Sequence, residues 1–225
     1  MVAVFRRVSP PQAPTLVIPV NTMPDSKKTD SEHALIRKEL RQRRQALSQK
    51  QQEVAAEQLC SNLLADPDYQ AADTVAFYLP FDGEISPLNI LSHAFEQGKT
   101  CCLPVLDAVL PELHFVECRT GAVLQSNRYG IEEPAFNTAN LVPPAQLDII
   151  FLPLVAFDLQ GTRLGMGKGY YDRTLSAFKA SGLAGKPLLI GLAHECQRVA
   201  HLERADWDVP LDRIVTDQSV YFARS

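Results

Sequence analysis

The feature that most constrains the fold of this chain is a short glycine-rich segment between an apolar run and a helical pattern. Residues 149–155 are apolar, and the helical pattern begins at Tyr171. The segment between them contains four of the eleven glycines in the chain, Gly161, Gly165, Gly167 and Gly169. A strand, a glycine-rich loop and a helix start present backbone N–H groups and the positive end of the helix dipole to a phosphate. The segment therefore predicts a nucleotide-phosphate site.

The loop matches neither of the two commonest phosphate-binding motifs. A Walker A loop has four residues between its first glycine and a Gly-Lys pair, which is followed by Ser or Thr. Here five residues separate Gly161 from Gly167, and Gly169 follows Lys168. A dinucleotide-binding fingerprint would require glycine where Tyr170 stands. A flexible surface loop with incidental charges is the alternative interpretation of this segment.

Strands and helices alternate along the rest of the chain. Strands are predicted from β-branched, aromatic and apolar runs at residues 74–79, 100–105, 112–118, 148–155, 187–193, 213–216 and 220–223. Helices are predicted at residues 30–47 after a capping box at 29–32, at 48–65, at 87–98 with Ser86 as N-cap, and at 171–180. Residues 121–144 are predicted to be mostly loop. This alternation is typical of an α/β fold, so we expect a single three-layer domain, with a mainly parallel sheet and helices on both faces.

The domain is predicted to occupy residues 29–225, because the chain before it has a different composition. The first thirty residues hold five of the sixteen prolines and show no sustained periodicity. We interpret residues 1–28 as a disordered lead or an extension. An organelle transit peptide is one alternative, since Arg6 and Arg7 are basic, and a true start at Met23 is another.

Composition restricts the class of partner. The net charge of -4 argues against nucleic acid as the main partner, and no apolar stretch approaches the roughly 18 residues that a membrane span needs. The five cysteines form no CxxC pair, which indicates reduced thiols in a reducing compartment. We therefore expect a cytoplasmic monomer that binds small molecules, with neither nucleic acid nor a membrane as partner.

The charged residues around the glycines suit phosphoryl transfer. That chemistry requires cations around the transferring group, a carboxylate for Mg²⁺ and a backbone cradle. The segment supplies Arg163, Lys168 and Asp172. Because parallel α/β sheets bind ligands at the carboxyl ends of their strands, Glu84 is expected to line the same cleft. Solvated loop charges, and for Asp172 compensation of the helix dipole, are the alternative interpretations.

The sequence RLGMGKGYYD, from Arg163 to Asp172, closely resembles the loop of the 5-formyltetrahydrofolate cyclo-ligase family, also called 5,10-methenyltetrahydrofolate synthetases. Weaker resemblances follow in the family's order at residues 37–41, 77–84, 130–134 and 208–212, so that about residues 34–220 are covered. The resemblance implies that ATP and Mg²⁺ are used to convert 5-formyltetrahydrofolate into 5,10-methenyltetrahydrofolate, ADP and phosphate. ATP would phosphorylate the formyl oxygen, and N10 would then attack the activated carbon.

The resemblance also implies roles for individual residues. Arg163 and Lys168 would act on the transferring phosphoryl group as catalytic residues. The ATP-binding residues would be Arg37, Lys38, Arg41, Arg163, Gly165, Gly167, Lys168, Gly169, Tyr170 and Tyr171. The folate would contact Leu79, Glu84, Gly167, Lys168 and Tyr170. Mg²⁺ would be held by Asp172 and Asp212.

Two positions depart from the family's pattern, and other interpretations stay open. Arg37 stands where the family often has Lys. Met166 stands where some relatives carry Arg, so one phosphate or glutamate-tail contact is expected to be missing. Arg37 and Arg41 also fit a solvated helix face, while Glu84 fits a turn and Asp212 a cap. The alternative functions are an ATP-dependent kinase or ligase for another small acid, and a non-catalytic folate or nucleotide sensor.

Overall fold

The computed structural model describes residues 26–180, 187–204 and 208–223, and it centres on one seven-stranded sheet. The strands follow one another across the sheet in the order β11-β10-β9-β6-β1-β2-β3. Their bounds are β1 Thr74–Ala76, β2 Thr100–Leu106, β3 Leu113–Cys118, β6 Ile149–Pro153, β9 Leu188–Ala193, β10 Arg213–Thr216 and β11 Val220–Phe222. The five central strands pair in parallel, and the two edge strands, β3 and β11, pair antiparallel. The mainly parallel sheet predicted from the sequence is confirmed.

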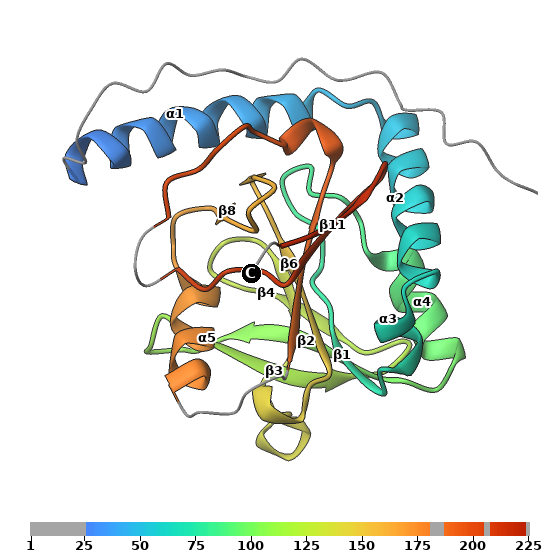
Figure 1. Cartoon of the computed structure of the whole chain (residues 1–225). Coiled ribbons are helices and arrows are strands. Elements are labelled where there is room, and N and C mark those ends of the chain that lie inside the picture. The colour runs from blue at the N-terminus through green and yellow to red at the C-terminus, as the bar shows by residue number, and fades with distance from the viewer. Residues whose placement is uncertain (1–25, 181–186, 205–207, 224–225) are drawn as a thin grey trace, which may run out of the picture.

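Helices cover both faces of the sheet (Figure 1). They are α1 Ser26–Gln45, α2 Gln49–Leu64, α3 Pro67–Ala71, α4 Leu88–Glu96 and α5 Tyr170–Ala180. Side chains alternate between the two faces along a strand. In β6, Phe151 packs with the residues of α2, α3 and α4, whereas Ile150 and Leu152 pack with Leu175 of α5. The three-layer arrangement predicted from the sequence is therefore confirmed.

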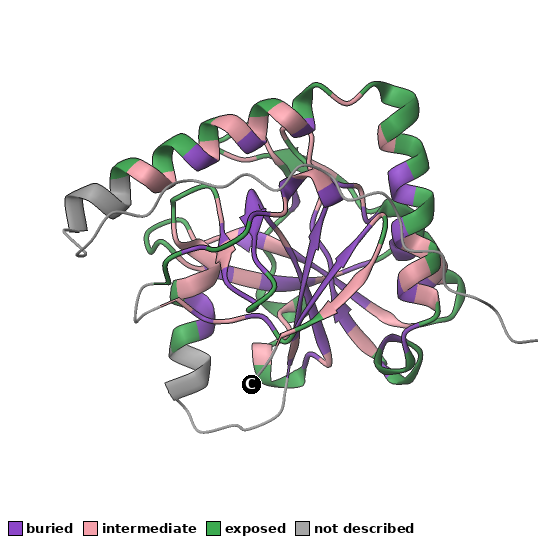
Figure 2. Ribbon diagram, turned by 45° about the horizontal axis from the view of Figure 1, so that its top comes forward, coloured by how far each residue is buried: buried purple, intermediate pink, exposed green. Residues whose placement is uncertain are grey.

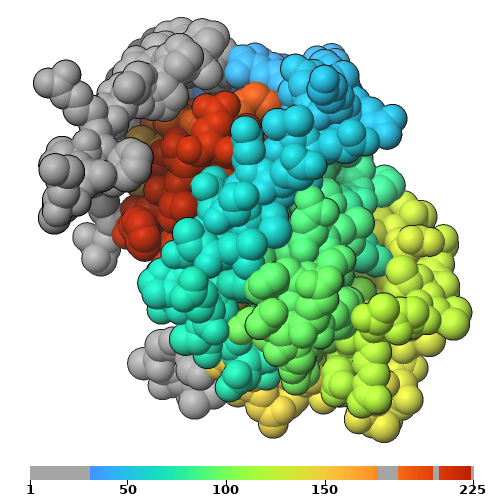
Figure 3. Space-filling model, turned by 90° about the vertical axis from the view of Figure 1, so that its right-hand side faces the viewer, coloured from blue at the N-terminus to red at the C-terminus, as the bar shows by residue number. Residues whose placement is uncertain are grey.

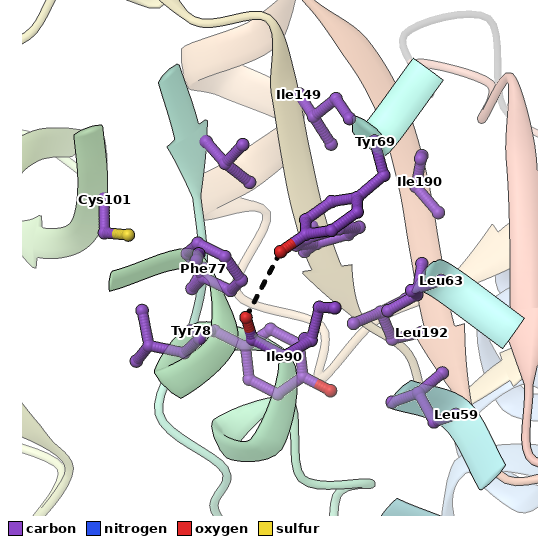
Figure 4. Packing of buried hydrophobic residues seen from close by; sticks show 14 of the residues in the cluster. Leu59, Leu63, Tyr69, Phe77, Tyr78, Ile90, Cys101, Ile149, Ile190 and Leu192 are labelled. Atoms are coloured by element: carbon purple, nitrogen blue, oxygen red, sulfur yellow. Dashed lines mark hydrogen bonds between the residues drawn. The ribbon is translucent and has the colours of Figure 1, made fainter. Parts of the chain in front are cut away.

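The short helix α3 anchors the larger of these two core clusters. Its Tyr69 lies among Leu63 of α2, Phe77 and Ile90 (Figure 4). The Tyr69 hydroxyl donates a hydrogen bond to the carbonyl of Ile90 at 3.4 Å. Side chains of α2 and α4 form much of the surface on this side of the molecule (Figure 3). The sequence pattern did not predict α3, because five residues are too few to show a helical period.

Helix α1 covers neither face and lies instead across the carboxyl ends of the strands (Figure 1). Its Ile36 and Leu40 pack with Val155, which follows β6, and with Val199, which follows β9. Buried and half-buried residues lie on the side of α1 that faces the sheet, and exposed residues on the other (Figure 2). The basic residues of α1 are thereby brought to the edge of the sheet at which ligands bind in this class of fold.

Some helix boundaries differ from the predicted ones. Helix α1 already includes Ser26, so the predicted capping box at residues 29–32 does not begin it, and residues 26–28 of the predicted lead are helical. Lys27 and Lys28 precede the box, and because lysine favours helix, α1 begins before the box. Residues 1–25 lie outside the described residues. The second predicted capping box is confirmed, because Ser48 and Gln51 exchange both hydrogen bonds. In α4 the N-cap is Pro87, although Ser86 Oγ accepts the N–H of Leu88.

Two short hairpins stand where loop was predicted. Residues 121–144 contain β4 Leu124–Ser126 and β5 Glu132–Pro134, which pair antiparallel. The glycine-rich segment begins with a second hairpin, β7 Ala156–Phe157 and β8 Arg163–Leu164, with Gly161 in its turn. Strands of two or three residues are too short for a period-2 pattern to reveal them. Only residues 165–169 form the loop that leads into α5.

Replacing Gly161 by alanine is expected to destabilise the protein more than the same change at Gly98. Both glycines have positive φ, +81° and +72°, which costs a residue with a Cβ about 1 kcal/mol. At Gly161 the new Cβ would also lie 2.7 Å from Ala223 Cβ and 2.9 Å from the Leu211 carbonyl oxygen, whereas at Gly98 it meets nothing within 4 Å. We expect the crowding to add about 1–3 kcal/mol to the loss for Gly161→Ala, measured by urea unfolding. Equal losses for the two variants would show that the segment over Gly161 moves aside freely.

Candidate active site

Arg37 joins α1 to the glycine loop. Its Nε donates a hydrogen bond to the carbonyl of Gly165 at 2.9 Å. A Cβ at Gly167, where φ is +86°, would lie 3.4 Å from Arg37 Cζ, so the bare backbone lets the guanidinium approach closely. Lys38, the next residue of α1, is exposed. Two elements predicted to bind ATP are therefore in direct contact.

Arg41 joins the same helix to the turn after β1. Its Nε lies 2.7 Å from Asp82 Oδ2. The hydrogen bond from Arg41 is the main reason why the pKa of the Asp82 carboxyl lies below its ordinary value. The prediction that Arg41 contacts ATP stays a prediction, since its partner here is Asp82. The turn predicted to bind folate is nevertheless held against the helix predicted to bind phosphate.

Arg163 and Asp172 are brought together, as their shared segment predicts. Arg163 lies in β8 with only 6% of its side chain exposed, and Asp172 lies in the first turn of α5. The Nη2 of Arg163 donates to Asp172 Oδ1, and its Nη1 donates to the carbonyl of Val209. Burial lowers the pKa of Arg163, and the charges of Asp172 and Asp208 oppose this shift. The pair places a cation and a carboxylate directly beside the loop.

Asp212, the second predicted metal ligand, has a different partner. It lies just before β10, and its Oδ2 accepts the N–H of Leu189 at 2.8 Å, at the amino-terminal end of β9. Asp172 lies in the first turn of α5, whereas Asp212 therefore lies beside the start of β9. Asp208, four residues earlier, is the carboxylate of this segment that acts on Arg163, and the sequence reasoning did not assign it a role. Among the described residues, no group of three or more His, Cys, Asp or Glu side chains could hold a metal ion.

Lys168 lies exposed in the loop, and Arg173 supports the backbone around it. The Nη2 of Arg173 donates to the carbonyl of Lys168, and its Nε donates to the carbonyl of Pro111 at 2.8 Å. A Cβ at Gly169 would lie only 2.9 Å from Arg173 Nη1. The sequence reasoning missed Arg173. Its position one helical turn after Gly169 is the signal that could have revealed it.

The two tyrosines that end the loop point to different partners. The Tyr170 hydroxyl lies 2.7 Å from Arg128 Nη2 and 3.0 Å from the Tyr129 hydroxyl. Arg128 and Tyr129 lie between β4 and β5, so this hairpin, within residues predicted to be mostly loop, lies next to the glycine loop. The Tyr171 hydroxyl is buried instead, which raises its pKa, and the charge of Glu84 raises it further. Tyr171 therefore lies near the turn that carries Glu84.

Glu84 is a largely buried carboxyl at that turn. Its side chain is 10% exposed, its Oε2 accepts the N–H of Phe81 at 3.1 Å, and its Oε1 lies 3.7 Å from Arg44 Nη2. Burial raises the pKa of Glu84 to about 7, although the charge of Arg44 lowers it. Leu79, also predicted to contact folate, is half-buried and packs against the larger core cluster. Near neutral pH the Glu84 carboxyl is available in both its ionised and its protonated form.

As the pH rises from about 4.5 to about 7, the free energy of unfolding of Glu84→Gln is expected to increase relative to that of wild type. The folded-state pKa of Glu84 is raised, so in this range the folded protein holds a proton that the unfolded chain has released. Wild-type stability therefore falls across the window, by up to about 3 kcal/mol, and glutamine removes this contribution. Urea unfolding of both proteins at several pH values measures the difference. A difference that does not change with pH would contradict the raised pKa.

No helix among the described residues has the length and apolar character that crossing a membrane requires.

Comparison with known proteins gives the same family as the loop motif. Residues 29–217 match the model of the 5-formyltetrahydrofolate cyclo-ligase family. A 5-formyltetrahydrofolate cyclo-ligase of Escherichia coli K12 is 38% identical over 183 residues, which cover 81% of this chain and 98% of that protein. One from Haemophilus influenzae is 39% identical over 177 residues, covering 78% and 92% of the two chains.

A solved structure shares the architecture. The 5,10-methenyltetrahydrofolate synthetase of Aquifex aeolicus superposes with a TM-score of 0.71 at 34% identity, over 86% of this chain and 93% of that chain. The sheet, the glycine loop and the helix laid across the strand ends thus occur together with a family match over most of the sequence. The chain belongs to the 5-formyltetrahydrofolate cyclo-ligase family.

Proposed function

We propose that this protein uses ATP and Mg²⁺ to convert 5-formyltetrahydrofolate into 5,10-methenyltetrahydrofolate, with release of ADP and phosphate. The observation that carries the proposal is that α1 contacts both the glycine loop and the turn after β1. Arg37 binds the glycine loop at 2.9 Å, and Arg41 binds the turn that leads to Glu84 at 2.7 Å. Membership of the cyclo-ligase family supports the same reaction.

The reaction needs positioning more than a protein nucleophile. The N5-formyl oxygen is amide-like and a poor leaving group. Transfer of the γ-phosphoryl group to this oxygen breaks the bond to the β–γ bridging oxygen, releases ADP and leaves an activated, imidate-like carbon. N10 then attacks that carbon and loses its proton, and phosphate departs as the five-membered ring closes. Orientation of the two substrates and stabilisation of developing charge supply the catalysis.

The loop and α1 are proposed to bind the triphosphate. Backbone N–H groups at Gly165, Gly167 and Gly169 suit phosphate oxygens, as does the positive end of α5. Arg37, Lys38 and Arg41 contribute positive charge from α1. Lys168 is exposed and able to reach the γ-phosphate, and Arg163 adds charge from beneath the loop.

The residues present fit a Mg²⁺ ion. Mg²⁺ commonly binds one or two carboxylates, with phosphate oxygens and waters completing its shell. Asp172 offers one carboxylate, 28% exposed, in the first turn of α5. We propose that Asp172 holds the ion, which would neutralise charge on the triphosphate. Asp212 is not included, because it lies beside the amino-terminal end of β9, where its Oδ2 accepts the N–H of Leu189, and not in the first turn of α5 beside the loop.

The turn after β1 is proposed to bind the folate. Leu79 offers an apolar contact, and Glu84 is placed to hydrogen bond with N–H groups of the pterin ring. Tyr170 offers a ring face for stacking, while Gly167 and Lys168 border both ligands. We further propose that the protein acts as a cytoplasmic monomer, without nucleic acid or membrane partners. The net charge of -4 supports the lack of a nucleic-acid partner, and the free cysteines support a reducing compartment.

Absorbance in the near ultraviolet, where the conjugated methenyl product absorbs, tests the proposal. A rise that requires 5-formyltetrahydrofolate, ATP and Mg²⁺ together is expected. Phosphate release with another small acid, and no rise with the folate, would instead identify a kinase or ligase on the same scaffold. Binding of ATP and folate without turnover would identify a sensor.

A further inference from the structure

Arg44 is a fully buried arginine to which none of the ligand contacts above is assigned. Its side chain is 0% exposed. Its Nε donates to the carbonyl of Asp82 at 2.9 Å, and its Nη2 donates to the Asp82 carboxylate at 2.9 Å. Its Nη1 donates to the carbonyl of Leu154, also at 2.9 Å. A buried cation is stable only when such partners are present, and these partners come from two separate segments.

The two segments are the turn that carries Glu84 and the chain that leads to the glycine loop. The turn follows β1, and Leu154 follows β6, the neighbouring strand of the sheet. The Nη2 of Arg44 also lies 3.7 Å from Glu84 Oε1 and 3.9 Å from Met166 Sδ in the loop. Because the guanidinium is planar and rigid, one side chain sets the spacing between turn and loop.

The turn itself is of a kind that needs support. Asp82 has a φ of +55°, in the left-handed region that a residue with a Cβ rarely adopts. Arg44 binds both its carbonyl and its carboxylate, while Gln45 Nε2 and Arg41 bind the carboxylate alone. His194, buried directly after β9, lies close to the same turn, because the backbone of Gly83 opposes the lowering of the His194 pKa by burial. The contacts from α1 therefore hold the turn in an otherwise unfavourable conformation.

We propose that Arg44 is a positioning residue, whose guanidinium holds the Glu84 carboxyl in place relative to the glycine loop without touching folate or ATP. The inference rests on the proposed function, since it requires Glu84 to bind the folate. The charges of Arg44 and Asp82 act on the pKa of Glu84, and the charge of Glu84 acts on the pKa values of Tyr78 and Tyr171. Arg44 is the cation of this set, so its loss both frees the turn and makes Glu84 harder to ionise.

Steady-state kinetics of Arg44→Lys and Arg44→Gln test this role. Lysine keeps the charge but loses the fork, and glutamine loses both. We expect kcat/KM for 5-formyltetrahydrofolate to fall about tenfold or more in Arg44→Gln and less in Arg44→Lys, with the KM for ATP within about twofold of wild type. Arg43→Gln is the matched control, because Arg43 lies on the same helix and pairs with Glu39 at the surface.

The pH profile gives a readout that a purely structural role would not move. In Arg44→Gln the ionisation of Glu84 seen in kcat/KM should shift to higher pH, and in Arg44→Lys it should stay near the wild-type position. In a Glu84→Gln background, Arg44→Lys should have a much smaller effect on kcat/KM, since the group through which it acts is gone.

The outcomes separate this inference from the function on which it rests. Wild-type protein that forms no methenyl product would overturn the proposed function. Normal wild-type turnover with equal losses for ATP and folate, or an Arg44→Lys effect unchanged in the Glu84→Gln background, would overturn the role of Arg44 alone. If Arg44→Gln fails to fold by circular dichroism, the Arg44→Lys comparison in the two backgrounds decides the question.

Discussion

Replacing Lys168 by alanine is expected to lower kcat by about two orders of magnitude, while the affinity for folate changes little. The lysine is exposed in the loop between Gly167 and Gly169, and the proposed function gives its ammonium the role of stabilising the transferring phosphoryl group. Loss of one such charge-stabilising group typically costs 100-fold or more, or about 3 kcal/mol of transition-state stabilisation. Steady-state kinetics, together with equilibrium binding of 5-formyltetrahydrofolate, would measure both quantities.

Because Lys168 is exposed, the effect of its replacement on activity can be separated from an effect on stability. An exposed side chain contributes little to folding, so the melting temperature of Lys168→Ala should match that of wild type. Lys50→Ala is a suitable control, since Lys50 is an exposed lysine of α2 that is given no role in the site. Equal losses in kcat and folate affinity would place Lys168 on the substrate instead of the phosphoryl group.

Replacing Asp172 by alanine is expected to abolish most of the turnover at millimolar Mg²⁺. A metal ion contributes several kcal/mol to the transition state, so a loss on the order of 100-fold or more is expected. The same change leaves Arg163, 6% exposed, without its carboxylate partner, so some loss of stability should accompany it. Turnover as a function of Mg²⁺ concentration, compared with thermal unfolding, separates the two effects.

Asp172→Asn sharpens the interpretation. Asparagine can still accept a hydrogen bond from Arg163 but is a poorer ligand for Mg²⁺, so it should retain stability better than activity. Asp73→Asn, at an exposed carboxylate outside the site, should change neither. Wild-type rates in Asp172→Ala at millimolar Mg²⁺ would remove Asp172 from the metal site.

The sequence predicted the framework because burial on both faces leaves a clear signature. Strands β6 and β9 are near-continuous apolar runs, as central strands of a parallel sheet must be. The hairpins β4–β5 and β7–β8 left no such signature, because their strands have only two or three residues. Their positions depend on contacts across the fold, such as that between Arg128 and Tyr170, which local pattern does not encode.

The candidate site was predicted only in part, because local contacts can be inferred from the sequence and contacts between distant segments cannot. Arg163 and Asp172 lie nine residues apart, so their proximity follows from one local segment. Arg44 belongs to a basic tract of α1 in which every arginine looks alike in the sequence, and its burial depends on Leu154, 110 residues away. That Asp212 binds metal stays a prediction, while Asp208, for which no role was predicted from the sequence, is the residue of that segment whose charge acts on Arg163. Tertiary geometry decides these cases.

The position of α1 has a consequence for how the molecule is assembled. The first described helix closes the site through Arg37 and Gly165, which are 128 residues apart, and through Arg44 and Leu154. On the ribosome α1 emerges long before the glycine loop exists, so these contacts form only after most of the sheet has been synthesised. Such contacts between distant parts of a chain carry a high loop-closure cost and slow folding. The ability to bind nucleotide is therefore acquired late in folding, once the first helix has docked on a nearly complete chain.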